Sequence, residues 1–331
     1  MKLLRKLLFP FSLIYWVITA VRNKFYDFGW LKSKAYDFPV ICVGNLSTGG
    51  TGKSPMIEFL ISRLKCEWRL AVLSRGYKRE TKGFKMVEVD STVLETGDEP
   101  LQFKRKFPKI TVAVCEDRQE GVEILRKNSD LILLDDAFQH RKVRASYYIL
   151  LTSYGNLFVD DFILPVGNLR EPKSGADRAD VLVVTKCPGK LEPSEMERIR
   201  KKLRLQTHQE VYFTKIGYAR EITDGVNTKS LEYLNKIKFT LVTGIANPKP
   251  LVEFLKNKGL EFYHKSYGDH HNFTIGEITD LERERIILTT EKDFMRLQPV
   301  IKNAELYYLP ITTEFLGNTS EEFLKRIFSN L

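Results

Sequence analysis

The sequence has 331 residues, of which 43% are hydrophobic and 28% are charged. This length is sufficient for two domains with complete cores, and the composition excludes an intrinsically disordered protein. The formal net charge of +10 indicates an acidic partner, which could be anionic lipid, nucleic acid or a phosphorylated substrate. The four cysteines are scattered without a C-x-x-C pair, which favours reduced, buried thiols over a zinc site.

The chain opens on a basic and apolar segment. The apolar run over residues 7–21 is flanked by lysine and arginine and is interrupted by Pro10. It is shorter than the ~20 residues that a membrane-spanning helix needs, and it lacks the cleavage site of a signal peptide. We therefore expect residues 1–30 to form a helix in the membrane interface, with Tyr15 and Trp16 at headgroup depth. A helix packed on the surface of the protein itself is the alternative.

A predicted phosphate-binding loop follows. Residues 40–55 have the pattern of an apolar strand, a glycine-rich turn and the start of a helix. The backbone N–H groups of such a turn bind phosphate at the positive end of the following helix. We expect Lys53 to reach the outer phosphates and the Ser54 hydroxyl to bind Mg²⁺. The general pattern has a glycine where this chain has Ser47, so only its second half matches strictly. The predicted nucleotide-binding residues are Ser47, Thr48, Gly49, Gly50, Thr51, Gly52, Lys53 and Ser54.

Short apolar runs then alternate with helical patterns. The runs are continuous and rich in β-branched residues, which is typical of buried parallel strands. They cover residues 69–74, 110–114, 131–135, 148–152 and 181–186. Strands that alternate with helices after a phosphate-binding loop predict an α/β fold, a P-loop NTPase domain with a mostly parallel, doubly wound sheet, over residues 31–216.

A smaller C-terminal α/β domain is predicted over residues 217–331. A polar stretch precedes a second strand, turn and helix pattern, which begins at Phe239 and has Pro248 in the first helical turn. Further apolar runs and a terminal helix from Ser320 follow. Residues 269–271 read Asp-His-His, a weak metal motif that could instead bring a general base to the first domain.

Carboxylates end one of the predicted strands. Asp135 and Asp136 follow an apolar run in the Walker B arrangement, which favours a role with Mg²⁺ or its water shell over the capping of a helix. By contrast, the segment 97–100 has two adjacent carboxylates in a turn-like sequence, and turns often carry such residues.

Two further features concern the nucleotide. The segment 185–188 occupies the place of the guanine-reading Asn-Lys-x-Asp motif but lacks its final aspartate, so ATP is the better candidate. Arg75, Arg118 and Arg170 follow strands or lie in loops, as phosphate-binding arginines do, although ordinary surface arginines occur there too.

Together, these segments resemble the tetraacyldisaccharide 4′-kinases of lipid A biosynthesis. The resembling segments occur in the family's order and cover residues 43–55, 74–77, 97–100, 135–140, 164–172, 267–273 and 290–293. The resemblance implies Mg²⁺-dependent transfer of the γ-phosphoryl group of ATP to the 4′-hydroxyl of a tetraacylated glucosamine disaccharide 1-phosphate. It also implies a peripheral enzyme at the cytoplasmic face of the bacterial inner membrane, with no nucleic acid and no obligate protein partner.

The resemblance also implies roles for individual residues. Asp98 corresponds to the catalytic base, and His270 raises its basicity or orients it from the second domain, while Lys53 binds phosphate. The metal residues are Ser54, Asp135, Asp136 and Glu171. The substrate residues are Asn45, Arg75, Arg118, Gln139, His140 and Arg170. The chain departs from the family at Asp136-Ala137 and Gly167-Asn168, which affects loop geometry.

Two other functions remain open from the sequence. A membrane-recruited P-loop ATPase that acts on a protein partner explains the N-terminal segment and the phosphate-binding loop, but not the Asp269-His270 pair. A soluble nucleotide-dependent ligase or carboxylate kinase leaves the N-terminal segment without a role.

Overall fold

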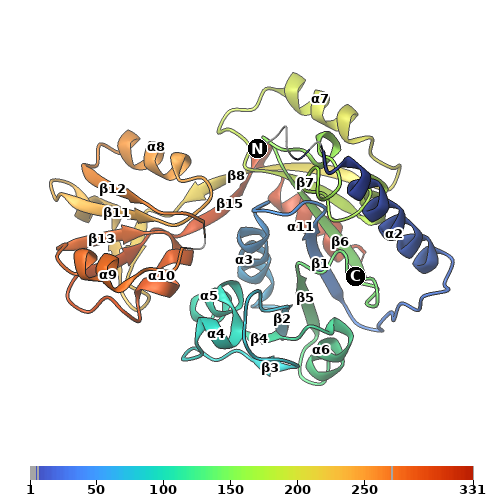
Figure 1. Cartoon of the computed structure of the whole chain (residues 1–331), viewed down its shortest axis with the longest axis horizontal. Coiled ribbons are helices and arrows are strands. Elements are labelled where there is room, and N and C mark those ends of the chain that lie inside the picture. The colour runs from blue at the N-terminus through green and yellow to red at the C-terminus, as the bar shows by residue number, and fades with distance from the viewer. Residues whose placement is uncertain (1–4, 6, 270, 331) are drawn as a thin grey trace.

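The chain folds around two β-sheets, which form a larger and a smaller α/β lobe in the computed structural model (Figure 1). The structure describes residues 5, 7–269 and 271–330. The expected α/β architecture is confirmed.

The larger sheet has nine strands. They are β1 (Val40–Asn45), β2 (Leu70–Ser74), β3 (Lys85–Met86), β4 (Thr111–Val114), β5 (Leu131–Asp135), β6 (Tyr147–Ser153), β7 (Val181–Thr185), β8 (Glu210–Tyr218) and β15 (Ile311–Phe315). Their order is β15-β8-β7-β6-β1-β5-β2-β4-β3. The strands from β8 to β4 pair in parallel, and β15 and β3 are antiparallel edges. The sheet is therefore mostly parallel, as predicted, and its functional edge lies where the parallel strands end.

Helices cover both faces of this sheet because successive strand residues point to opposite sides. In β1, Ile41 and Val43 belong to one apolar core, whereas Val40 and Cys42 belong to the other. The first core is covered by α3 (Lys53–Leu64), α5 (Asp98–Lys106) and α11 (Ser320–Phe328), and the second by α6 (Arg118–Leu125) and α7 (Pro193–Leu203).

The smaller lobe has a six-stranded sheet with the order β10-β9-β14-β13-β11-β12. Its strands are β9 (Glu221–Thr223), β10 (Thr228–Ser230), β11 (Phe239–Thr243), β12 (Phe262–Ser266), β13 (Ile286–Thr289) and β14 (Glu305–Tyr308). Its helices are α8 (Lys249–Asn257), α9 (Ile275–Leu281) and α10 (Glu291–Leu297). Pro248 is the residue that precedes α8, close to its expected place in the first turn.

The last elements of the chain return to the larger sheet. Strand β15 pairs antiparallel with β8, and the helix expected from Ser320 buries Phe323 and Ile327 in the larger core. The segment from Ile311 onward, which the sequence analysis placed in the second domain, therefore lies with the first. Its pairing partner is about a hundred residues away in the chain, and no local pattern indicates such a contact.

The segment predicted as a turn at residues 97–100 begins a helix instead. After the short helix α4 (Val93–Thr96), Gly97 adopts a left-handed φ of 86° and α5 starts at Asp98. A Cβ atom on Gly97 would lie 3.1 Å from the carbonyl oxygen of Tyr77, so glycine is required here. This abrupt break places two carboxylates in the first turn of α5, where the helix dipole favours negative charge.

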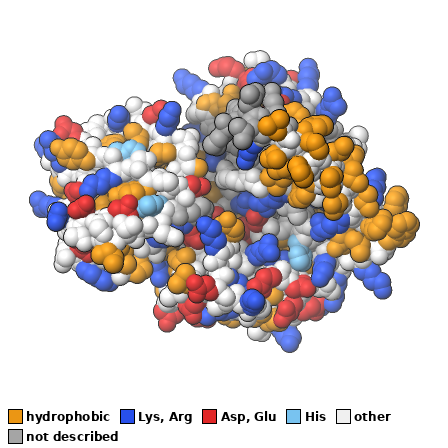
Figure 2. Space-filling view, in the orientation of Figure 1, with side chains coloured by type: hydrophobic (Ala, Val, Ile, Leu, Met, Phe, Trp, Pro, Cys, Tyr) orange, Lys and Arg blue, Asp and Glu red, His pale blue; other side chains and the backbone are white. Residues whose placement is uncertain are grey.

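The N-terminal helix α2 (Phe9–Asp27) turns its polar side chains toward the protein. Ser12 and Thr19 are its buried residues, and Pro10 lies in its first turn, which proline tolerates. The outward face is apolar, with Phe11, Ile14 and Ile18 about 60% exposed. Figure 2 shows this hydrophobic surface over α2. None of the helices in the described ranges is long and apolar enough to cross a membrane.

Candidate active site

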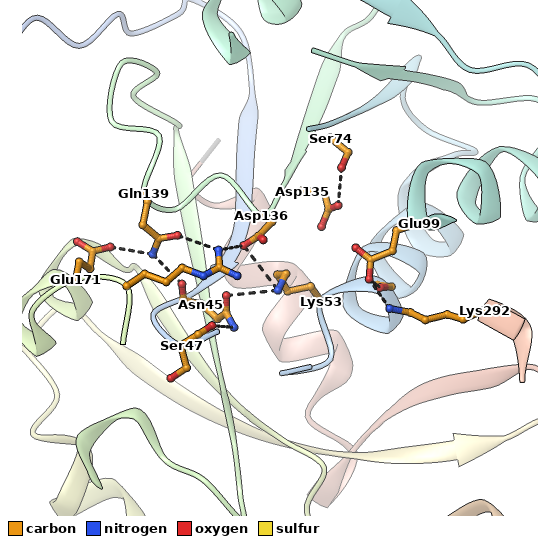
Figure 3. Close-up of polar contacts among 12 residues, drawn as sticks. Asn45, Ser47, Lys53, Ser74, Glu99, Asp135, Asp136, Gln139, Glu171 and Lys292 are labelled. Carbon is orange, nitrogen blue, oxygen red and sulfur yellow. Dashed lines mark hydrogen bonds and ion pairs between the residues drawn. The ribbon is translucent and has the colours of Figure 1, made fainter. Parts of the chain in front are cut away.

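The phosphate-binding loop joins β1 to α3. Gly52 precedes α3 with a left-handed φ of 88°, and Lys53 is the first helical residue. The Lys53 ammonium lies 3.4 Å from Oδ1 of Asn45 and 3.7 Å from Oδ1 of Asp136 (Figure 3). The predicted loop residues therefore form the junction between strand and helix that phosphate binding requires.

Asp135, the last residue of β5, has one carboxylate oxygen without a partner. The Ser74 hydroxyl donates to its Oδ2 at 3.0 Å, whereas its buried Oδ1 has no hydrogen-bond partner in the described part of the chain. Burial, followed by the charges of Glu99 and Asp136, raises the pKa of Asp135 to about 7. An unpaired buried carboxylate oxygen beside a phosphate-binding loop fits a divalent cation or its bound water.

Asp136 lies with three of the predicted substrate residues. Its Oδ1 accepts a hydrogen bond of 2.8 Å from Arg170, whose guanidinium also lies 3.4 Å from Oε1 of Gln139. The Gln139 amide donates in turn to the carbonyl oxygen of Asn45 at 2.8 Å. Figure 3 shows Asn45, Asp136 and Gln139 together beside Lys53, and the hydrogen bonds of Arg170 add it to this group.

Glu171 is buried on the far side of this group. Its carboxylate accepts hydrogen bonds from Asn23 at 2.7 Å, and from Gln139 and Arg178 at 2.9 Å each. These contacts connect α2 to the site through Asn23. The metal role of Glu171 stays a prediction, because its oxygens bind N–H groups in this conformation.

Charged residues of α10 reach the site from the smaller lobe. The Ser54 hydroxyl donates to Oε1 of Glu99 at 2.7 Å, and the Lys292 ammonium donates to the same oxygen at 2.6 Å. Burial acts to raise the pKa of Glu99, but the cations of Lys292 and Lys53 lower it to about 2. Asp98 forms an ion pair with Arg296. Both carboxylates of the first turn of α5 thus contact the second lobe.

Arg118 and His140 lie on the same side of the larger lobe. Arg118 is buried at the start of α6 and donates to the carbonyl oxygen of Cys115 at 2.9 Å, and burial lowers its pKa. Burial, followed by the charge of Arg118, also lowers the pKa of His140 to about 4, so the imidazole is neutral at physiological pH. Arg75, which follows β2, is exposed.

The predicted partner of Asp98, His270, lies outside the described residues. Its neighbour His271 stacks on Tyr267 with ring centroids 4.8 Å apart and forms a 2.9 Å hydrogen bond with Glu277. His271 therefore belongs to a polar and aromatic cluster of the smaller lobe. The catalytic role of His270 stays a prediction from the sequence.

A family model described as tetraacyldisaccharide-1-P 4′-kinase, LpxK, matches residues 4–329 of the chain. The chain belongs to this family. It is similar to the tetraacyldisaccharide 4′-kinase of Flavobacterium johnsoniae, with 47% identity over 100% of this chain and 99% of that one. The enzyme of the same name from Bacteroides thetaiotaomicron is 41% identical, over 98% and 92% of the two chains.

A solved structure supports the same assignment. The crystal structure of LpxK from Aquifex aeolicus in complex with ATP has a TM-score of 0.79 and 32% identity, and the match covers 98% of each chain. The expected P-loop α/β fold and the resemblance to the 4′-kinases are confirmed. This chain is therefore a phosphotransferase of lipid A biosynthesis, and the alternatives of an ATPase switch and a carboxylate ligase are set aside.

Several residues of the site were not identified from the sequence. Asn23 and Arg178 bind Glu171, and Arg296 binds Asp98, yet each lies outside the glycine-rich and acidic motifs. Lys292 lies within the segment 290–293, which the resemblance to the 4′-kinases includes but does not explain. A lysine in the first turn of a predicted helix is the one feature of the sequence that could have indicated an anionic partner for Lys292.

Proposed function

We propose that this 4′-kinase transfers the γ-phosphoryl group of ATP to the 4′-hydroxyl of a tetraacyldisaccharide 1-phosphate, in a site between its two lobes. One observation carries the assignment: Lys53 and Ser54 of the phosphate-binding loop lie at the edge of the larger sheet beside the α5 carboxylates, and α10 of the smaller lobe contacts those carboxylates. A site between two lobes excludes water, which otherwise competes with the sugar hydroxyl for the phosphoryl group.

The nucleotide end of the site is supported by the loop geometry. Backbone N–H groups of residues 47–52 and the Lys53 ammonium bind the phosphates of ATP. Ser54, Asp135 and Asp136 are the residues that would hold Mg²⁺, and the unpaired Oδ1 of Asp135 fits this role. When bound, the ion neutralises charge on the phosphate oxygens. To hold the ion, the Ser54 hydroxyl would give up its hydrogen bond to Glu99.

Asp98 is proposed as the general base. It lies in the first turn of α5 and forms an ion pair with Arg296 of the smaller lobe. An Asp98 oxygen takes the proton of the 4′-hydroxyl while the new O–P bond forms and the bond to the leaving ADP breaks. His270 is proposed to orient Asp98, on the sequence resemblance alone.

The acceptor is proposed to lie against the polar group around Asp136. Asn45, Gln139 and Arg170 supply amide and guanidinium groups that suit a sugar and a phosphate. Arg118 adds positive charge, and the neutral imidazole of His140 can exchange hydrogen bonds with sugar hydroxyls. Arg75, exposed after β2, is proposed to bind the 1-phosphate end or the nucleotide.

Helix α2 is proposed to hold the enzyme on the cytoplasmic face of the inner membrane. Its apolar residues point outward and its polar residues point toward the site, the arrangement of an interfacial helix. Arg22 donates to the carbonyl oxygen of Gln139 at 2.9 Å, and Tyr15 donates to that of Arg170 at 2.9 Å. The membrane helix and the acceptor site are thus directly connected.

We further propose three functional units. The membrane helix covers residues 1–30, and the kinase domain covers residues 31–216 together with the returning segment from Ile311. The closing domain is formed by the residues between 216 and Ile311. Strands β8 and β15 connect the last two. The second domain therefore still begins at residue 217, but it ends before Ile311. We propose that this domain closes on the kinase domain around the bound substrates.

The test is transfer of label from γ-labelled ATP to disaccharide 1-phosphate lipid in detergent micelles. Wild-type protein should label the lipid, and Lys53→Met should abolish labelling, because we propose that Lys53 binds the outer phosphates of ATP. Hydrolysis of ATP without any labelled lipid would overturn the proposal in favour of an ATPase switch.

A further inference from the structure

A cavity of about 850 Å³ lies between the end of α2, the linker that follows it and the starts of β6 and β7. Its walls are formed by some of the residues in the segments 26–35 and 138–148, together with Arg178 and Asp180. None of the phosphate-binding loop residues, Asp98 or Asp135 lines it. The cavity is thus separate from the nucleotide site, although it opens on the same helix that we propose to lie in the membrane.

Positive charge predominates in this cavity. Its cations are Lys32, Arg141, Arg144 and Arg178, and its acids are Asp27 and Asp180. The acids are already bound: Asp27 pairs with Arg141 at 2.8 Å, and Asp180 accepts a 2.7 Å hydrogen bond from the backbone N–H of Tyr148. Lys32 and Arg144 are exposed and make no side-chain hydrogen bond or ion pair with any described residue. The cavity is therefore lined by two cations that have no anionic partner among the described residues.

The wall that carries these two cations is fixed by the backbone. Lys34 and Val143 form a parallel β-bridge, the N–H of Arg144 donates to the carbonyl oxygen of Lys34 at 2.8 Å, and the Ser33 hydroxyl donates to that of Arg141 at 2.6 Å. The linker and the segment after Phe138 are thereby held together. Lys32 lies two residues before this isolated bridge and Arg144 directly after it, so an anion between them binds at a low cost in backbone ordering.

An aromatic surface adjoins the cavity. Phe28 and Trp30 are 66% and 70% exposed, and their rings lie 5.9 Å apart. Phe25 lies 5.0 Å from Trp30 and extends this surface to the outward face of α2. Exposed aromatic rings beside basic side chains are typical of the headgroup layer of a bilayer. An apolar rim next to a cationic cavity matches the two parts of an anionic lipid.

We infer that this cavity binds the phosphate headgroup of an anionic bilayer phospholipid, whose acyl chains extend along Phe28 and Trp30. The inference rests on the proposed membrane attachment of α2 and deepens it. Lys32 and Arg144 would bind the phosphate, and the bound lipid would fix the end of α2 at the membrane surface. Because α2 contacts Gln139 and Glu171, this second anchor would also fix the orientation of the acceptor site toward the bilayer.

The experiment uses the full chain with Trp16→Phe and Trp68→Phe, which leaves Trp30 as the single tryptophan beside the cavity. Short-chain phosphatidylglycerol, monomeric below its micelle concentration, is titrated while Trp30 fluorescence is recorded. We expect a saturable change with phosphatidylglycerol and a much weaker one with short-chain phosphatidylcholine. Lys32→Gln with Arg144→Gln should weaken binding by about 10-fold or more, the effect of removing two cations near an anionic lipid. Lys249→Gln with Lys256→Gln, two exposed cations of α8 that do not line the cavity, is the matched control.

Several results would overturn the inference. One is an equal response to the two lipids, and another is phosphatidylglycerol binding by the Lys32→Gln, Arg144→Gln variant that equals that of the control. A third is inorganic phosphate that binds as tightly as phosphatidylglycerol, which would indicate a soluble-anion site. An increased KM for the disaccharide in the Lys32→Gln, Arg144→Gln variant, without a change in phosphatidylglycerol binding, would assign the cavity to the substrate. Because the probe lipid is monomeric, flotation of wild-type protein with vesicles tests the membrane attachment separately. Kinase activity on micellar substrate reports that the variants are folded.

Discussion

Asp98 and Glu99 are adjacent in the sequence, yet they have different partners in the site. Asp98 pairs with Arg296, whereas Glu99 binds the Ser54 hydroxyl and Lys292. Helical geometry causes this difference, because successive residues point about 100° apart around the axis. One turn of α5 therefore offers a carboxylate toward the proposed acceptor and another toward the metal position.

If Asp98 is the general base, Asp98→Asn should lower kcat by at least ~10²-fold, the usual contribution of such a group, while ATP still binds. The amide keeps the size of the side chain but takes no proton. Initial rates on micellar lipid and calorimetric titration with ATP measure the two quantities. Turnover equal to wild type would remove Asp98 from the mechanism.

Asp135 should make the stability of the metal-free protein depend on pH. Its folded pKa of about 7 exceeds its ordinary value of 3.8 because burial, Glu99 and Asp136 disfavour its charge, against the opposing effect of Lys53. The stability that protonated Asp135 contributes is therefore fully present below pH ~4, and it is lost as pH rises toward 7. Asp135→Asn should stabilise the metal-free protein by about 1–3 kcal/mol at pH 8 and by less at pH 5.

Urea unfolding at the two pH values, with a chelator present, measures this effect. Asp90→Asn is the control, because Asp90 is exposed and does not act on Asp135, so its substitution should give no gain. An equal effect of Asp135→Asn at both pH values would contradict the buried, uncompensated charge that we assign to the metal position.

At the scale of elements, α5 and α10 form the polar contact between the lobes. Besides the pairs at Asp98 and Glu99, Lys106 of α5 lies 2.6 Å from Glu58 of α3 and 3.1 Å from Glu291 of α10. Burial raises the pKa of Glu58, and together with the charge of Glu58 it raises that of Glu291 to about 8. The ammonium of Lys106 therefore compensates the charge of these two buried carboxylates and allows them to lie close together.

Lys106→Met should destabilise the protein by on the order of 3 kcal/mol, because it leaves two buried carboxylates without their cation. Chemical denaturation measures the loss. The triple variant with Glu58→Gln and Glu291→Gln should recover most of it, since no unpaired charge then remains. If the single and triple variants were equally unstable, lost packing of the lysine stem would be the cause instead.

The sequence predicted the elements whose pattern is local. The phosphate-binding loop, the strand that ends in Asp135 and the run of parallel strands all have local patterns of apolar residues and glycine. It did not predict that Gly97 ends α4 and starts α5, because this depends on a backbone contact with Tyr77. It also missed the return of β15 to β8 and the binding of Arg296 to Asp98, which join residues far apart in the chain.

At the scale of the whole molecule, the outward face of α2 should determine membrane binding. Ile14 and Ile18 are 58% and 60% exposed, so charges there do not disturb the core. Ile14→Asp with Ile18→Asp should lower vesicle binding by more than ~10-fold, because two apolar side chains no longer enter the lipid. Val226→Asp, at an 89% exposed position of the smaller lobe, is the control. Equal vesicle flotation of both variants would contradict the proposed orientation of α2.

The whole molecule combines a nucleotide site, an acceptor site and a membrane helix. Its central proposed property is therefore that each ATP it consumes gives one phosphoryl group to the lipid. The most direct measurement is the stoichiometry of ADP to product, with the position of the new phosphate determined by phosphorus NMR. We expect one new phosphomonoester at the 4′-position for each ADP formed. ADP without a new phosphomonoester, or a phosphate at another hydroxyl, would contradict the arrangement of Asp98, Lys53 and the lipid acceptor proposed here.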